Sequence, residues 1–154
     1  MKNNSIKNVF LFFTSCFFVQ ALQAQLQGVE EARTKYPDVS AVYLNKSQQY
    51  RIFMDKGVLS GVCDVHEQIY INKESGLVFQ SRSIGTNKFV EASNIKAFTM
   101  VLKNKKYDKQ VVDKIELKSD PGKYSFYDDQ KSYAVVFPAV QPGAVLDLSY
   151  QLKY

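Results

Sequence analysis

Alternation of apolar and polar residues is the feature that most constrains what this chain can fold into. It is clearest at the end of the sequence, where every second residue is apolar from Leu146 to Tyr154. The polar residues between them are Asp147, Ser149, Gln151 and Lys153. Successive side chains of a strand point to opposite faces of a sheet, so this spacing predicts a strand with one buried and one solvent-exposed face.

The same period of two recurs from Ala41 onward. The segment "QYRIFMD" puts Tyr50, Ile52 and Met54 on one face, and "FTMVLK" and "KIELKS" alternate in the same way. In "VCDVHEQIYI" one face carries Cys63, Val65, Ile69 and Ile71, and the other carries Asp64, His66, Gln68 and Tyr70. Turn-forming stretches such as "MDKG" and "NKESG" separate the runs. The pattern predicts an all-β fold, mainly an antiparallel β-sandwich.

One short N-terminal helix is expected over "GVEEARTKY" (Gly28–Tyr36). Glu30 and Glu31 near its start suit the positive end of the helix dipole, and Pro37 disfavours helical geometry in the residue before it. The least regular stretch, Leu77–Asn94, is predicted to hold a short helix, a broken strand or both.

Two prolines and a glycine predict a structural turn before the last strand. Pro138 cannot donate to a sheet ladder, so the preceding strand should end there or lie at an edge. Pro142 presets φ for a turn, and Gly143 supplies the positive φ that a type II turn needs next. We therefore expect the final strand to return antiparallel to "SYAVVF" as a long hairpin.

The N-terminus has the three parts of a secretory signal peptide: Lys2 and Lys7, an apolar block from Val9 to Leu22, and small Ala24. The block is shorter than the roughly 20 residues that span a bilayer, so no stable membrane span is expected after cleavage. "FTSC" loosely resembles a lipobox, but the apolar run continues past it. Residues 1–24 are predicted as a signal peptide, and lipidation at Cys16 stays open as an alternative.

Cleavage after Ala24 leaves residues 25–154, which we predict to be a single exported domain, periplasmic, envelope-bound or secreted. Removing two lysines lowers the formal net charge from +5 to +3. No dense basic stripe remains, so nucleic-acid binding is not expected. The domain keeps a single cysteine, Cys63, which excludes an internal disulfide.

The segments "FPAVQPGAVLDLSYQLKY" and "KYPDVSAVYL" resemble a domain of unknown function in exported bacterial proteins. The resemblance extends over roughly Ala32 to Tyr154. It implies a β-sandwich that usually precedes a transglutaminase-like domain. Members of that family continue with more strands, so the resemblance also implies that residues 25–154 are C-terminally truncated and that any catalytic activity belongs to a downstream part.

Catalytic and metal sites find little support. Cys63 and His66 would be the pair for a cysteine hydrolase, but residues three apart on a strand face opposite sides of the sheet. One histidine and one cysteine are too few for structural zinc. Asp128 and Asp129 lack the ligand spacing of a calcium loop. We expect no catalytic residues, no metal and no cofactor.

The preferred prediction is a non-catalytic docking module whose partner is another protein or a downstream transglutaminase-like domain. The alternative is a glycan- or peptide-binding module of the cell envelope, because tyrosine combines contact area with a hydroxyl group. Tyr70, Tyr127 and Tyr133 are its candidate contacts. Self-association through an exposed edge at Ala144–Tyr154 is also expected, since unpaired edges invite another strand.

Overall fold

The computed structural model describes residues 28–103, 106–119 and 130–154. The chain divides into two compact units, Met1–Pro37 and Asp38–Tyr154. Residues 28–35 of the first unit are helical, which confirms the predicted helix. The predicted signal peptide with Cys16, and the candidates Tyr127, Asp128 and Asp129, lie outside the described residues.

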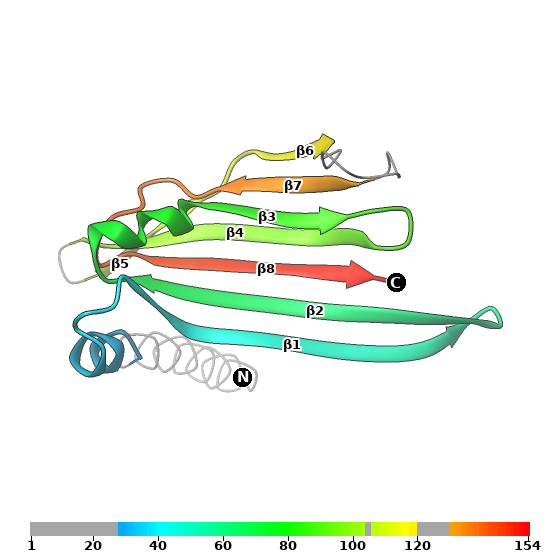
Figure 1. Ribbon diagram of the computed structural model, residues 1–154, viewed down its shortest axis with the longest axis horizontal. Helices are drawn as coiled ribbons and strands as arrows, with labels where there is room; N and C mark the ends of the chain where they lie inside the picture. The colour runs from blue at the N-terminus through cyan, green and yellow to red at the C-terminus, as the bar shows by residue number, and fades with distance from the viewer. Residues whose placement is uncertain (1–27, 104–105, 120–129) are drawn as a thin grey trace, which may run out of the picture. The chain divides into compact units, whose positions relative to one another are not determined.

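The described part of the second unit contains eight strands and one 3₁₀-helix, which Figure 1 shows in chain order. Their bounds are β1 Ala41–Asp55, β2 Val58–Ile71, η1 Glu74–Gln80, β3 Ser81–Thr86, β4 Glu91–Lys103, β5 Lys106–Val111, β6 Ile115–Ser119, β7 Lys131–Val136 and β8 Val145–Lys153. The irregular stretch Leu77–Asn94 therefore holds both a short helix and strands.

The strands form two antiparallel sheets, one of five strands in the order β1-β2-β8-β4-β5 and one of three in the order β3-β7-β6. Buried side chains from both sheets meet in one core. They are Ile69, Ile71, Ile84, Ala92, Ala97, Val135, Phe137, Leu146 and Leu148. Two sheets around a shared apolar core form a β-sandwich, so the predicted fold class is confirmed.

The long hairpin expected at the end of the chain is wrong. β7 pairs with β3 and β6, whereas β8 lies in the other sheet between β2 and β4. The connection from Phe137 to Ala144 carries the chain from one sheet to the other. β8 is hydrogen bonded on both sides, so Ala144–Tyr154 is not the exposed edge that we expected.

The turn inside this connection has the predicted form. Ala144 N–H donates to the Gln141 carbonyl over 3.0 Å, and Gly143 has φ +91°. Pro142 and Gly143 therefore occupy the two central positions of a type II turn. Pro138 stands just after β7, where it costs the sheet no ladder hydrogen bond.

An ion pair joins the two sheets beside the core. Glu67 of β2 is buried and pairs with Arg82 of β3, and Lys46 of β1 approaches the same carboxylate at 3.9 Å. A buried carboxylate is costly unless a cation and hydrogen bonds compensate it. Glu67 interrupts the apolar face of β2, and Arg82 is the residue that makes this position tolerable.

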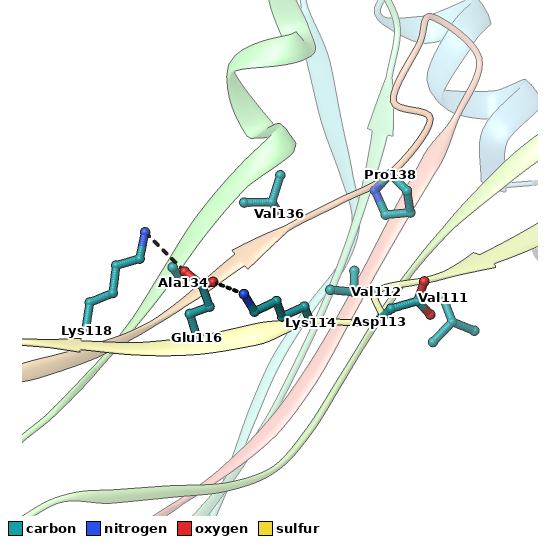
Figure 2. A pocket seen from close by; sticks show the side chains of 9 residues that line it. All are labelled: Val111, Val112, Asp113, Lys114, Glu116, Lys118, Ala134, Val136 and Pro138. Carbon is teal, nitrogen blue, oxygen red and sulfur yellow. Dashed lines mark ion pairs between the residues drawn. The ribbon is translucent and has the colours of Figure 1, made fainter.

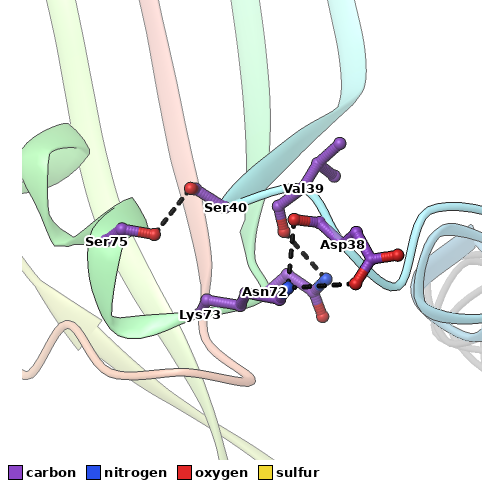
Figure 3. A network of polar contacts seen from close by, with 6 residues as sticks. All are labelled: Asp38, Val39, Ser40, Asn72, Lys73 and Ser75. Carbon is purple, nitrogen blue, oxygen red and sulfur yellow. Dashed lines mark hydrogen bonds and ion pairs between the residues drawn. The ribbon is translucent and has the colours of Figure 1, made fainter.

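A polar network fixes the start of β1 to the segment that follows β2 (Figure 3). The Ser40 carbonyl accepts from the backbone N–H of Asn72 at 2.9 Å and of Lys73 at 3.1 Å, and the Ser40 and Ser75 hydroxyls are 2.6 Å apart. The Lys73 ammonium donates to the Asp38 carbonyl at 3.0 Å. These contacts set where the β1–β2 pairing begins.

Candidate interaction surface

The far end of the β1–β2 hairpin extends past its neighbours as a two-stranded ribbon. The β2–β8 ladder ends at Val62↔Lys153, Gly61 and Tyr154 then exchange two backbone hydrogen bonds, and Figure 1 shows β1 and β2 continuing beyond the end of β8. We call residues 50–59 the β1–β2 ribbon. Its exposed large apolar side chains are Tyr50, Ile52, Phe53, Met54, Val58 and Leu59.

The ribbon closes with a turn that its sequence encodes locally. Asp55 pairs with Val58 across Lys56 and Gly57, and both central residues have positive φ, +49° and +83°. Two such residues make a type I′ turn, whose twist matches that of the strands. The pairing Met54↔Leu59 and Phe53↔Ser60 follows directly from this turn.

The base of the ribbon carries a cluster of hydroxyls and one thiol. Cys63 pairs with Tyr50 on one side and with Leu152 on the other, and its side chain is buried. The pKa of Tyr50 is raised mainly by its hydrogen bond with Cys63, and the nearby Tyr154 raises it further. Burial raises the pKa of Tyr150, with the Glu67 charge adding to it. Tyr50 and Tyr150 therefore stay neutral hydrogen-bonding groups at neutral pH.

On the opposite face of the five-stranded sheet, a polar cluster surrounds His66. The His66 Nε2 lies 3.1 Å from Asp147 Oδ2, and Asn45 Nδ2 lies 3.0 Å from His66 Nδ1. The Gln68 amide also donates to Asp147, at 2.7 Å. Asp147 is only 5% exposed, although the alternation predicted that its side of β8 would face solvent. Its hydrogen-bond donors make that burial possible.

A hollow of ≈ 340 Å³ lies beside this cluster. Its lining includes Ser47, Asp64, His66, Lys96 and Ser149. Asp64 already accepts hydrogen bonds from Arg51 and Gln151, each at 2.8 Å. The register of β4 shifts between Ser93 and Lys96, and such a bulge turns neighbouring side chains to new directions. Val65 and Tyr150 add apolar surface to the hydrogen-bonding groups of this lining.

A second hollow, of ≈ 320 Å³, lies against the three-stranded sheet (Figure 2). Its apolar residues are Val111, Val112, Ala134, Val136 and Pro138. At its rim Glu116 sits between two lysines, with Nζ–Oε distances of 2.6 Å to Lys114 and 3.6 Å to Lys118. The Lys114 ammonium holds the pKa of Glu116 below its usual range. The rim charges thus largely satisfy one another.

The structure separates the two residues of the cysteine-hydrolase alternative. Cys63 is 1% exposed and lies on the core-facing side of β2, whereas His66 points to the polar side. Both ring nitrogens of His66 are engaged, by Asp147 and Asn45. A thiolate activated by an imidazole needs the two in contact, and this arrangement does not bring them together.

The predicted tyrosine contacts do not form one surface. Tyr70 is 5% exposed, although the alternation assigned it to the wet face, and Tyr133 packs against the core. Tyr127 lies outside the described residues. Tyr50, which we did not single out as a site residue, is the tyrosine that lies on the ribbon. The glycan- or peptide-binding alternative stays a prediction without an aromatic cluster at these positions.

Within the described ranges, no three His, Cys, Asp or Glu side chains come together as a metal site. In the same part of the chain, no helix combines the length and the apolar character needed to cross a bilayer.

Sequence reasoning missed the exposed ribbon. The alternation correctly put Tyr50, Ile52 and Met54 on one face, and that face was expected to be buried. Met54 is exposed because β1 and β2 outrun the neighbouring strand β8, and Tyr50 and Ile52 lie on β1 beside the end of β8. Strand length relative to a neighbour is not written in either segment. The one local signal is the long pair of apolar runs around the "DKG" turn.

Comparison with known proteins identifies the family. Residues 59–154, more than half of the chain, match the family described as "Domain of Unknown Function with solved-structure structure (DUF3857)". The chain belongs to the DUF3857 family. The match begins at Leu59 in β2, so β1 lies before the matched residues. Membership confirms the predicted domain of unknown function; the transglutaminase-like neighbour stays a prediction.

The DUF3857 domain also resembles a solved structure. A crystal structure from Parabacteroides distasonis ATCC 8503, described as "a putative protease", superposes with a TM-score of 0.63 at 15% sequence identity. The alignment covers 74% of this chain but 23% of the other, so this chain spans about a quarter of the Parabacteroides protein. At this identity the likeness shows the fold alone. No curated protein matches the sequence significantly.

Proposed function

We propose that this chain is a non-catalytic, exported β-sandwich module that docks onto another protein through the β1–β2 ribbon. One observation carries the proposal: six large apolar side chains are exposed on a single projecting ribbon. Four of them, Tyr50, Ile52, Met54 and Leu59, share one face of the ribbon, and exposed apolar surface of this kind is typical of protein–protein contact sites. The N-terminal apolar block with its flanking lysines supports export.

The modular character is supported by the Parabacteroides protein, in which this fold accounts for 23% of the chain. A domain that is a small part of a longer protein commonly contacts its neighbours. The sequence resemblance adds a transglutaminase-like domain as the expected neighbour. The protease description belongs to that longer protein, and at 15% identity no catalytic residue is transferred from it.

The absence of a catalytic role is supported by the placement of the most reactive groups. The Cys63 thiol is buried, and buried thiols in apolar surroundings are poor nucleophiles. Both nitrogens of His66 already have partners, which leaves neither in position to take a proton from a substrate.

A pair of double variants tests the docking function. Ile52→Ser with Leu59→Ser removes two ribbon side chains that are 74% and 70% exposed. Val78→Ser with Phe89→Ser, at 75% and 72%, is the matched control outside residues 50–59. We expect only the ribbon variant to weaken association of the exported chain, by tenfold or more. Association is measured by sedimentation for self-interaction and by titration calorimetry with a transglutaminase-like domain encoded beside it. Equal behaviour of both variants in both assays would refute the proposal.

A further inference from the structure

Among the described residues, no strand pairs with the outer edge of β1. β1 is the terminal strand of the five-stranded sheet, and among the described strands only β2 pairs with it. It is 15 residues long, and all its side chains from Lys46 to Asp55 are exposed. An edge of this length offers a row of backbone N–H and C=O groups for pairing.

The two-residue turn determines which backbone groups face that edge. Residues of an antiparallel hairpin direct their N–H and C=O groups alternately toward the partner strand and away from it. The pair that closes a two-residue turn is hydrogen bonded, and here that pair is Asp55↔Val58. Counting back along β1, Phe53 is directed to β2, and Ile52 and Met54 are directed to the free edge.

We propose that the occupant of this edge is a second copy of the chain, paired antiparallel along β1 with Phe53 on the twofold axis. The proposal rests on the docking function above and names its partner. A twofold axis perpendicular to the sheet keeps every side chain on its own face, so residues of equal parity oppose each other. In this register Ile52 opposes Met54 of the second copy, and the open backbone groups of both are used.

Charge selects this register over its neighbours. Centred on Phe53, the pairing sets Arg51 opposite Asp55 of the second copy, twice by symmetry. An axis at Ile52 would set Arg51 against Phe53, and an axis at Met54 would set it against Gly57. Asp55 has no ion pair with any described residue, and Arg51 contacts Asp64 through one terminal nitrogen, with further donors left.

Apolar surface favours the same arrangement. Ile52 and Met54 of both copies form one continuous patch on the face that also carries Tyr50 and Leu59, since Met54 pairs with Leu59. On the other face, Phe53 meets its own symmetry mate. Pairing therefore buries the side chains whose exposure in the single chain is hardest to explain.

Disulfide trapping tests the register directly, in the exported chain of residues 25–154 carrying Cys63→Ala. Phe53 would form a non-hydrogen-bonded pair with its mate, with Cα atoms about 4.5 Å apart, which suits a disulfide. Ile52 and its own mate would lie about 8 Å apart, too far for a bond, and so would Met54 and its mate. We expect Phe53→Cys to give a covalent dimer under mild oxidation, and Ile52→Cys and Met54→Cys to give none.

Sedimentation across a concentration series supplies the second measurement. The unmodified chain should show a reversible monomer–dimer equilibrium. Asp55→Lys would place a second positive charge opposite Arg51 at both symmetric positions, so it should lower the dimer affinity about tenfold. A chain that stays monomeric, or that is trapped at Ile52 or Met54 instead, overturns this inference. Ribbon-dependent binding of the transglutaminase-like domain by a monomeric chain would leave the docking function standing.

Discussion

At the scale of single residues, Gly76 shows how closely the backbone packs at the start of the sandwich. A Cβ at this position would lie 2.4 Å from the Ser40 carbonyl oxygen, which already accepts two backbone hydrogen bonds. The neighbour is backbone and cannot turn away, so Gly76→Ala must displace the Ser40–Lys73 network. We expect the free energy of unfolding to fall by about 1–3 kcal/mol.

Chemical denaturation measures this loss, with Gly85→Ala as the matched control. A Cβ at Gly85 meets nothing within 4 Å, so the control should unfold close to the parent chain. Equal unfolding midpoints for the two variants would mean that Ser40 and Gly76 do not approach each other as the structure has them.

At the scale of elements, the turn that feeds β8 is decisive because β8 is the central strand of its sheet. Gly143 has φ +91°, and a Cβ added at this position would have no other atom within 4 Å. A larger residue there would strain the backbone without a steric clash. Gly143→Ala should destabilise the fold by about 1–2 kcal/mol. Gly143→Asn should cost less, because asparagine tolerates this position of a type II turn. Thermal unfolding of both variants checks the order; an equal loss would point to an effect other than φ.

At the scale of the whole molecule, the Glu67–Arg82 pair bridges the two sheets. Arg82→Met would leave a buried carboxylate without its main cation, and we expect a loss of about 2 kcal/mol, moderated because Arg82 is partly exposed. Lys46→Met should cost little, since Lys46 is largely exposed and 3.9 Å away. Adding Glu67→Leu to Arg82→Met should recover most of the stability, because a well-packed apolar pair can replace a buried ion pair. Denaturant titration of the three variants measures their free energies of unfolding. A double variant less stable than Arg82→Met would contradict the proposed role of the ion pair.

The sequence by itself determined the local features. Period two assigned Cys63 and His66 to opposite faces, the stretch "MDKG" and the Pro142–Gly143 pair marked two turns, and Pro37 ended the helix. These properties depend on φ, ψ and side-chain direction within a few residues, so a short segment contains all the information required.

Only the tertiary structure decided which strands are neighbours and what they cover. β8 lies between β2 and β4 and does not pair with β7, Asp147 is buried and hydrogen bonded to His66 and Gln68, and the apolar side chains at Tyr50–Leu59 face solvent. Hydrogen-bond partners and burial arise from contacts between segments distant in the chain. An antiparallel strand with suitable alternation fits many neighbours equally well, and the packing of the two sheets selects among them.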